Sequence, residues 1–487
     1  MKEQGFGTKI FNAAKWSTVT EIAAKLVIPL TNIILARIVA PEAFGVIATI
    51  TMIVSFADMF TDAGFQKYLI QYEFKNDSDK YNYANVAFWT NLFISLLLWI
   101  TIATFSGNIA AVVGNPGLGG IITLACIQLP LTSFSSIQLA LYRREFNFKT
   151  LFFVRIFALF VPVAITIPLA LLGMSYWAII IGTISTQIFN AIVLTIKSNW
   201  KPKAYYNIGI LKNMLSFSIW SLGEAFSIWL TTWVDTFIIG SLLSDYFLGI
   251  YKTSTTMVNT IMSLVTASIV PVMFSALSRL QDDKEKFINL YFKMQRIISI
   301  LILPLGIGIY LYSDLATDIL LGSQWEEASK IIGIWALTSS IMIVFGHFCS
   351  EVYRAQGKPK LSLLAQILHL IVLIPVCIIS ARYGFWVLIY ARAIVRFQFI
   401  IVHFFIMKLA IKISVMKTLK NVLPIVISSV IMGGIGYLLG RIYTGVLWEL
   451  ISIVICILLY FIVLMLFSNM RKEVILLGRK LTLNKLK

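Results

Sequence analysis

Charged residues are scarce in this sequence. They make up 13% of its 487 residues, whereas hydrophobic residues make up 59%, and the mean hydropathy is +0.87. A soluble globular domain carries about 25% charged residues. The composition therefore excludes a soluble protein and predicts an integral membrane protein.

Cysteine is equally scarce, and the motifs of several chemistries are missing. The four cysteines, Cys126, Cys349, Cys377 and Cys456, lie in apolar runs without disulfide or metal-ligand spacing, so we interpret them as core residues. The three histidines lack ligand spacing as well, and no glycine-rich phosphate loop with a lysine is present. We expect no metal, no cofactor and no nucleotide hydrolysis.

A cleavable signal peptide is not expected either. The first 16 residues, MKEQGFGTKIFNAAKW, are too polar to contain the apolar core of such a peptide. The first apolar segment would therefore act as its own insertion signal.

Long apolar segments dominate the rest of the chain. A helix that spans a bilayer needs about 20 mostly apolar residues, and segments of that length recur with short polar breaks between them. The sequence predicts an all-α membrane protein with about fourteen spans. The expected spans are 16–40, 44–66, 84–106, 118–141, 150–172, 176–196, 214–240, 247–275, 294–312, 328–353, 361–381, 384–407, 421–440 and 446–468.

The basic residues alternate between the two sides of this arrangement. About 31 of the 40 lysines and arginines lie in the N-terminal segment, in every second break and in the C-terminal tail. The opposite breaks hold only Arg382 and Arg441. Because cytoplasmic loops collect basic residues, we expect both termini in the cytoplasm and an even number of spans. The net charge of +18 then serves orientation and contact with anionic lipids, and nucleic acid is not an expected partner.

Weak internal repeats suggest a duplicated helix bundle. Trp16-Ser17 aligns with Trp220-Ser221 at a shift of 204 residues, and Leu141–Arg143 (LYR) matches Val352–Arg354 (VYR) further along. We expect two pseudo-symmetric six-helix lobes, residues 1–212 and 213–412, followed by residues 413–487 with two more spans and a basic cytoplasmic tail.

Ionisable residues inside the spans are the candidates for function. Each charge at the centre of a bilayer costs at least about 2.5 to 3.5 kcal/mol, so most should face water or a partner. Arg392 and Arg396 lie four residues apart and place two like charges on one helix face, which favours a bound anion. Glu224 is an alternative counter-ion for this pair. Glu21 and Lys25 form a second i, i+4 pair, which could also simply neutralise itself.

The chain also resembles a known family through a series of stretches in conserved order. They are FGVIATI, FADMFTDAGFQKYLIQ, AFWTNLFISLLL, LYRREFNFK, GMSYWAIIIG, VDTFIIGSLLSDYFLGIYKTS, PVMFSALSRLQ, LGSQWEEA and YRAQGKPKL. These resemble the Wzx and TuaB-type polysaccharide flippases, in the superfamily that also contains the MATE drug exporters. The resemblance implies a MATE-like fold in the bacterial inner membrane and transport of undecaprenyl-diphosphate-linked oligosaccharide to the outer leaflet for surface polysaccharide assembly.

The charged residues inside the spans can then be given roles. For such a cargo, we expect Arg392, Arg396 and Lys25 to bind the diphosphate, while Glu21 and Glu224 would serve as cavity counter-ions or bind a coupling ion. Asp58 matches an acid that similar proteins often carry at the cytoplasmic end of the second span, where we expect a gate pair with a basic group. Asp235 would pair with Lys252 near the outer face.

Three other functions are alternatives for a chain of this kind. A polysaccharide polymerase or ligase needs catalytic groups in an outer loop, and the longest outer breaks contain no Lys, Arg or His, so we expect no enzyme. A MATE-like exporter of organic cations needs an acid-lined pocket, whereas Lys25, Arg392 and Arg396 outnumber Glu21 and Glu224. A peptidoglycan precursor flippase would share the cargo chemistry. We further expect a monomer that contacts membrane lipids and can act beside the polysaccharide polymerase machinery.

Overall fold

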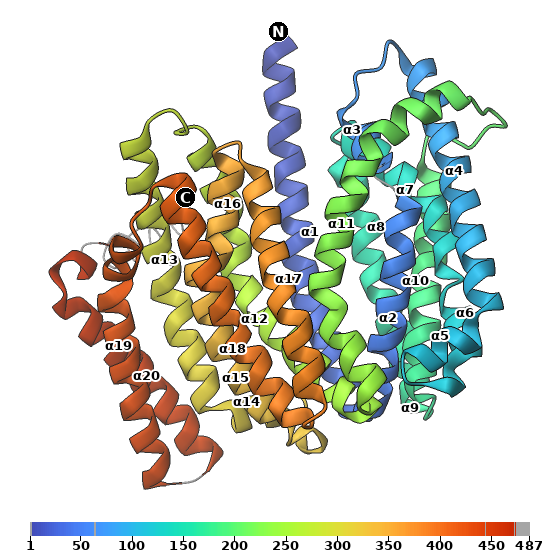
Figure 1. Ribbon diagram of the computed structural model, residues 1–487. Coiled ribbons are helices and arrows are strands. Elements are labelled where there is room, and N and C mark those ends of the chain that lie inside the picture. The colour runs from blue at the N-terminus through green and yellow to red at the C-terminus, as the bar shows by residue number, and fades with distance from the viewer. Residues whose placement is uncertain (1, 63–64, 444, 472, 474–487) are drawn as a thin grey trace. The chain divides into compact units, whose positions relative to one another are not determined.

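The computed structural model describes residues 2–62, 65–443, 445–471 and 473, and these residues form helices joined by short connections (Figure 1). No strand occurs among the described residues. Because lipid offers no hydrogen-bond partners, helices that satisfy their own backbone groups suit long apolar segments. The predicted all-α membrane fold is confirmed.

The chain divides into two compact units between Lys252 and Thr253. Unit 1 is residues 1–252, and α12 (Asp245–Ser278) crosses the division. The other elements of unit 1 are α1 (Lys2–Ile38), α2 (Pro41–Asp62), α3 (Phe65–Gln71), α4 (Asp77–Thr104), α5 (Ser106–Val112), η1 (Pro116–Leu118), α6 (Gly119–Ala125), α7 (Gln128–Arg144), α8 (Phe148–Val161), η2 (Pro162–Thr166), α9 (Ile167–Leu171), α10 (Ser175–Lys197) and α11 (Ile208–Leu242).

Unit 2 is residues 253–487 and contains the second half of the helices. Two of its elements, η4 and η5, are π-helical segments, as is η2 in unit 1. The elements are α13 (Lys284–Leu311), α14 (Ser313–Leu320), η3 (Ser323–Trp325), α15 (Ala328–Met342), η4 (Ile343–His347), α16 (Phe348–Ala355), α17 (Pro359–Ala381), α18 (Phe385–Ile406), η5 (Met407–Ile411), α19 (Val415–Ile442) and α20 (Val446–Leu466).

Twelve spans in the described part of the chain are long and apolar enough to cross a membrane. The long helices α11 and α12 cover the two remaining expected spans, and α11 contributes a shorter apolar segment, Phe226–Leu242. The number fourteen therefore stays a prediction.

Two turns, one in each unit, close in the same way. The turn after α7 and the turn after α16 both have a residue with positive φ, Phe146 at 57° and Gly357 at 67°. The next residue then donates its N–H to a carbonyl five positions back, Asn147 to Tyr142 at 2.9 Å and Lys358 to Tyr353 at 2.8 Å. This hydrogen bond is typical of a helix end with a left-handed residue. The turns lie 211 positions apart and contain the LYR and VYR motifs, which supports the predicted duplication.

Other connections repeat at similar distances. Gly173 before α10 and Gly384 before α18 have φ values of 82° and 107° and are also 211 positions apart. Gly114 and Gly322 have φ values of 85° and 96° and lie just before the short helical turns η1 and η3. These three turns thus recur in both halves of the chain, although the side chains of the two halves differ.

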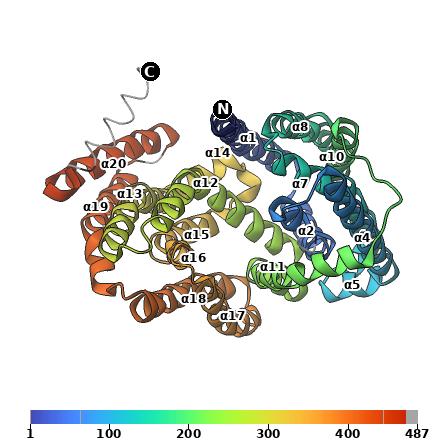
Figure 2. The same ribbon diagram turned by 90° about the horizontal axis from the view of Figure 1, so that it is seen from above.

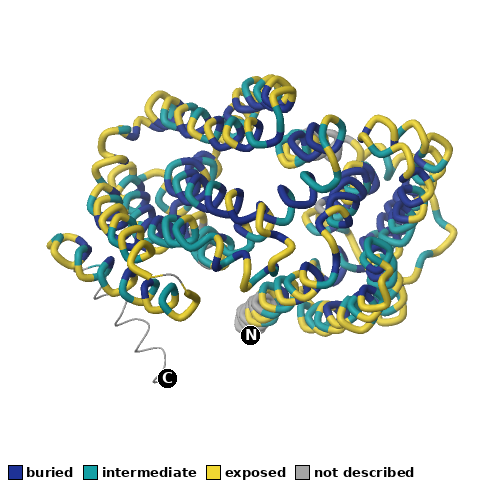
Figure 3. The backbone as a smooth tube through the Cα atoms, turned by 90° about the horizontal axis from the view of Figure 1, so that it is seen from below, coloured by how far each residue is buried: buried dark blue, intermediate teal, exposed yellow. Residues whose placement is uncertain are grey.

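Burial follows the pattern expected for helices in lipid. Figure 3 shows buried residues mainly on the inner sides of the helices and exposed residues mainly on their outer sides. Large apolar side chains are among the exposed residues, including Leu172 at 78% and Leu447 at 73%. All four cysteines are buried, which confirms their interpretation as core residues.

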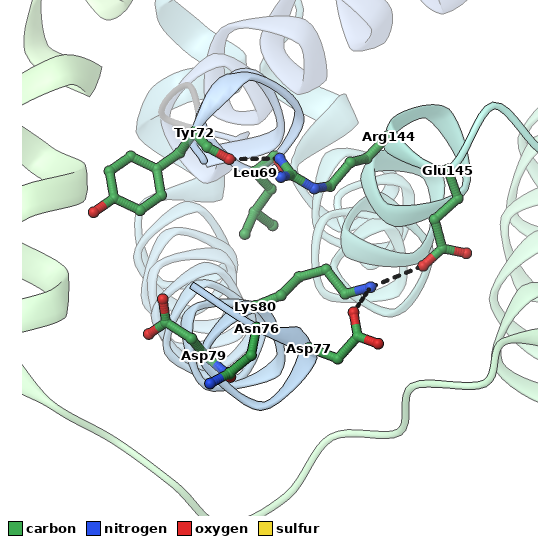
Figure 4. Close-up of polar contacts among 8 residues, drawn as sticks. All are labelled: Leu69, Tyr72, Asn76, Asp77, Asp79, Lys80, Arg144 and Glu145. Atoms are coloured by element: carbon green, nitrogen blue, oxygen red, sulfur yellow. Dashed lines mark hydrogen bonds and ion pairs between the residues drawn. The ribbon is translucent and has the colours of Figure 1, made fainter. Parts of the chain in front are cut away.

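Two basic residues near helix ends have structural partners (Figure 4). Lys80, at the start of α4, lies 3.0 Å from the carboxylates of Asp77 and Glu145. Arg144, at the end of α7, donates to the backbone carbonyls of Leu69, Ile70 and Tyr72 at 3.0, 3.1 and 2.6 Å, which satisfies groups left open at the end of α3. Both residues thus have structural contacts in addition to their positive charge.

The α2–α12 junction, formed by the first turns of these helices, is packed without room for side chains. A Cβ on Gly45 would lie 1.9 Å from the carbonyl oxygen of Asp245, and one on Gly249 would lie 1.8 Å from that of Pro41. The Asn115 amide donates to Asp245 Oδ1 at 2.7 Å. Burial raises the pKa of Asp245, and the hydrogen bond from Asn115 opposes that increase.

We predict that Gly249→Ala destabilises the protein, because the new methyl group forces α12 away from the carbonyl of Pro41. Overpacking of this kind costs about 1 to 3 kcal/mol. The measurement is thermal unfolding of the purified protein in detergent. Gly434→Ala, in α19, is the matched control, since a Cβ there meets nothing within 4 Å. Equal melting temperatures for the two variants would contradict the prediction.

A second prediction concerns orientation. Lys203 precedes α11 and Lys412 precedes α19, whereas Gly117 lies between α5 and α6. A fluorescent reporter fused after Lys203 or Lys412 should be active in the cytoplasm, and a phosphatase fused after Gly117 should be active outside. Cytoplasmic fluorescence from a fusion at Gly117 would overturn the expected orientation.

Candidate functional site

Arg396 lies in a pocket of aromatic and hydroxyl groups in unit 2. Its guanidinium carbon is 3.3 Å from the centre of the Trp335 ring, close enough for a cation–π interaction. The same group donates to Ser339 Oγ at 2.6 Å and to Thr338 Oγ1 at 3.2 Å. These contacts fix the orientation of the guanidinium.

Arg392 lies one turn earlier on α18 and shares the same tryptophan. Its guanidinium carbon is 5.6 Å from the centre of the Trp335 ring, and the residue is 7% exposed. Trp335 is itself oriented by its indole N–H, which lies 3.4 Å from Asn259 Oδ1. The structure thus brings both predicted arginines to one aromatic ring, in a group we call the Arg–Trp cluster: Arg392, Arg396, Trp335, Thr338 and Ser339.

Sequence analysis missed the partners on α15. Trp335, Thr338 and Ser339 are spaced as i, i+3 and i+4, so they share one face of that helix. The stretch WALTSS carries this spacing, but most such faces in an apolar helix only pack against neighbours. Only its contact with Arg396 of α18 distinguishes this face of α15 from other faces of apolar helices.

Two of the three histidines lie near the Arg–Trp cluster on α17 and α18. Their rings flank Phe399, with ring centres 4.3 Å away for His369 and 4.5 Å away for His403. His403 Nδ1 is 3.1 Å from Tyr353 Oη, and His369 Nδ1 is 3.1 Å from Gln398 Oε1. The two histidines are isolated from each other in the sequence, but they are neighbours in the fold.

His347 ends the π-helical segment Ile343–His347 and is exposed. Within the described residues, no three His, Cys, Asp or Glu side chains lie close enough to hold a metal ion.

In unit 1, Asp235 lies in a buried hydrogen-bond network on α11. It is 4% exposed and accepts a 2.6 Å hydrogen bond from Tyr251 Oη. Lys252, its predicted partner, lies 3.4 Å from Thr236 Oγ1 and 3.8 Å from the centre of the Trp233 ring. The structure therefore brings Asp235 and Lys252 into one neighbourhood, in which Tyr251 is a partner that the sequence did not reveal.

Asp58 lies near the end of α2 and has hydroxyl partners. Thr61 Oγ1 donates to its Oδ1 at 3.0 Å, and Thr132 Oγ1 lies 3.4 Å from the same atom. Pairing of Asp58 with a basic group at a gate stays a prediction. The side chain of the nearby Asp62 lies outside the described residues.

Glu21 and Lys25 lie on one face of α1. Glu21 is exposed and Lys25 is half-buried. The Glu224 side chain, on α11, lies outside the described residues, so its predicted relation to the arginines stays a prediction.

Comparison with known proteins identifies the family. Residues 34–330, more than half of the chain, match the model of a family described as "Polysaccharide biosynthesis protein". The chain is 20% identical to the lipopolysaccharide biosynthesis protein WzxC of Escherichia coli (strain K12), over 77% of this chain and 75% of WzxC. It is 22% identical to the succinoglycan biosynthesis transport protein ExoT of Rhizobium meliloti (strain 1021), over 63% of this chain and 62% of ExoT.

A solved structure shows the same fold. The lipid II flippase MurJ in an inward closed conformation matches 93% of this chain and 98% of its own chain, with a TM-score of 0.74 and 18% identity. This likeness confirms the predicted fold. The match to the family model shows that the chain belongs to the polysaccharide biosynthesis protein family.

Proposed function

We propose that this protein carries an undecaprenyl-diphosphate-linked oligosaccharide from the cytoplasmic to the outer leaflet of the bacterial inner membrane, by alternating access, for surface polysaccharide assembly. The observation that carries the proposal is the Arg–Trp cluster. Two arginines share one face of an apolar helix, and Arg396 is held by Trp335, Thr338 and Ser339. The names of WzxC, ExoT and MurJ support the same cargo class.

A diphosphate that enters a bilayer needs compensating positive charge. Arginine suits this role because its planar fork grips phosphate oxygens in pairs and keeps its charge where lysine can lose it. The tryptophan and the hydroxyls orient Arg396 in advance, so little side-chain entropy remains to be lost on binding. We assign diphosphate binding to Arg392, Arg396 and Lys25.

The acids would then act as counter-ions or gates. We assign Glu21 and Glu224 to counter-ion or ion-coupling roles, because an empty cationic site needs negative charge nearby. Asp58 would belong to the cytoplasmic gate, and Asp235 with Lys252 to the outer gate. The buried hydrogen bond from Tyr251 to Asp235 supports an ordered outer contact.

The remaining features follow from the same proposal. The protein would act as a monomer without catalysing a reaction, with both termini in the cytoplasm and with polymerase machinery as a possible neighbour. We assign residues 1–212 and 213–412 to the two lobes, and 413–487 to the last two helices and the tail. The repeated turns 211 positions apart support this division.

Deleting the gene should abolish one surface polysaccharide, while its lipid-linked unit accumulates on the inner leaflet. The measurements are polysaccharide composition and extraction of lipid-linked sugars, with plasmid complementation as the control. Normal polysaccharide together with altered drug sensitivity would favour a MATE-like exporter. A defect in peptidoglycan instead would indicate a precursor flippase.

Arg392→Lys or Arg396→Lys should reduce polysaccharide export roughly tenfold to a hundredfold, since each loses a paired charge-assisted hydrogen bond to phosphate. The corresponding Ala variants should be worse. Abundance in the membrane, measured by immunoblot, should not change. Arg441→Lys, at an exposed arginine at the end of α19, is the matched control and should export normally.

Two further variants separate phosphate binding from charge neutralisation. If Arg396 only neutralises Glu224, then Arg396→Gln combined with Glu224→Gln should restore export. Wild-type export in that double variant, or in Arg392→Ala with Arg396→Ala, would refute the diphosphate site.

A further inference from the structure

Unit 1 contains a cavity of about 270 Å³ that no proposed role has used. It lies among α1, α8 with η2, and α10, which Figure 2 shows next to one another in unit 1. Six polar side chains contribute to its lining: Thr31, Asn32, Thr166, Thr183, Thr186 and Gln187.

Local helix geometry explains the cavity. Pro162 begins the π-helical segment Pro162–Thr166, and proline together with the wider turn displaces the backbone of a helix. Thr166, the last residue of this segment, lies close against α10. A Cβ on Gly182 of α10 would lie only 1.7 Å from Thr166 Oγ1. The close contact at Gly182 and the wide turn beside it leave the space open.

The walls of the cavity are uncharged and combine six polar residues with the apolar residues Val27, Ile28, Leu35, Leu159, Pro162 and Ile179. The hydroxyls of Thr31, Thr183 and Thr186 donate to carbonyls of their own helices at 3.0, 2.8 and 2.8 Å, which leaves their oxygen lone pairs as acceptors. The amides of Asn32 and Gln187 add both donors and acceptors. None of the residues that line the cavity is ionisable.

The cavity lies on the buried side of α8 and η2. Leu159 and Thr166, which line it, are buried, whereas Phe157 and Phe160 are 59% and 56% exposed. Polar groups in an apolar environment are costly unless they find hydrogen-bond partners. The amides of Asn32 and Gln187 therefore favour water or a polar ligand in the cavity.

Sugar rings match this lining. A ring hydroxyl both donates and accepts hydrogen bonds, as the amides and threonines here do, and it needs no charged partner. An organic cation would need an acid and a phosphate would need a base, and the lining offers neither. The volume is slightly below the range of about 300 to 1,000 Å³ typical of small-molecule pockets, which favours a short stretch of sugar.

We infer that this cavity binds an uncharged sugar ring of the cargo, next to the diphosphate, and that Asn32 and Gln187 are its principal hydrogen-bonding residues. The inference rests on the proposed function. Lys25 and Asn32 are seven residues apart on one face of α1, about 10 Å along the axis at 1.5 Å per residue. A diphosphate held at Lys25 thus places its attached sugar at the level of Asn32.

Cysteine labelling tests the site directly. The native cysteines are all buried, so Asn32→Cys and Gln187→Cys provide new targets for a charged, water-soluble maleimide. Leu30→Cys is the matched control, since Leu30 is 58% exposed on another face of the same helix. Labelling is measured in membranes that lack lipid-linked sugar, in the same membranes with added undecaprenyl diphosphate, and in membranes in which lipid-linked oligosaccharide has accumulated.

We expect both pocket cysteines to label in sugar-free membranes, to label equally after undecaprenyl diphosphate is added, and to label at least fivefold more slowly when the oligosaccharide is present. The Leu30→Cys rate should be the same in all three membranes. Absence of labelling at Asn32→Cys would show a lipid-facing pocket, and protection by undecaprenyl diphosphate alone would show that lipid, not sugar, occupies it. Either result would overturn the inference, as would equal rates in all three membranes.

Export measurements separate this inference from the proposed function. Asn32→Leu and Gln187→Leu should lower export about tenfold, as expected for the loss of one or two buried hydrogen bonds. If deletion of the gene leaves the polysaccharide intact, the proposed function itself fails. If deletion abolishes export but both leucine variants export normally, only the sugar site fails.

Discussion

Charge inside a bilayer must be compensated, and the arrangement of this protein depends on how that compensation is made. Arg396 stacks on Trp335 and donates to Ser339, while Asp235 accepts a hydrogen bond from the buried Tyr251. Each contact lowers the cost of placing a charged group inside an apolar helix bundle. The positions of these charged side chains therefore depend on the neighbouring helices that supply their partners.

The two halves share their turns but differ in chemistry. Positive-φ residues recur 211 positions apart, so the helices of each half begin and end at equivalent points. Within this common frame, α18 of unit 2 carries two arginines, whereas α10 of unit 1 carries Thr183 and Gln187 beside an uncharged cavity. These corresponding helices of the two halves thus differ in charge. Under the proposed function, the diphosphate of the cargo and its attached sugars would present both kinds of group.

Backbone contacts hold the first turns of α2 and α12 together within unit 1. Gly45 and Gly249 bring backbone against backbone, and Asn115 adds a hydrogen bond to Asp245. A larger side chain at either glycine would force the two backbones apart. Lys80 pairs with Asp77 and Glu145, and Arg144 donates to carbonyls at the end of α3, so these contacts also lie within unit 1.

The sequence alone determined the class of the protein, because hydropathy and span length follow from composition and hold in any packing. It also indicated the arginine pair, since the four-residue spacing fixes a shared helix face before any tertiary contact forms. It could not identify Trp335, Tyr251 or Gly182 as partners, nor place His369 and His403 against Phe399. Those relations join different helices, and helix periodicity sets which face a residue occupies but not which neighbour that face meets. Only tertiary packing decided that α15 supports the arginines and that α1, α8 and α10 leave a polar cavity between them.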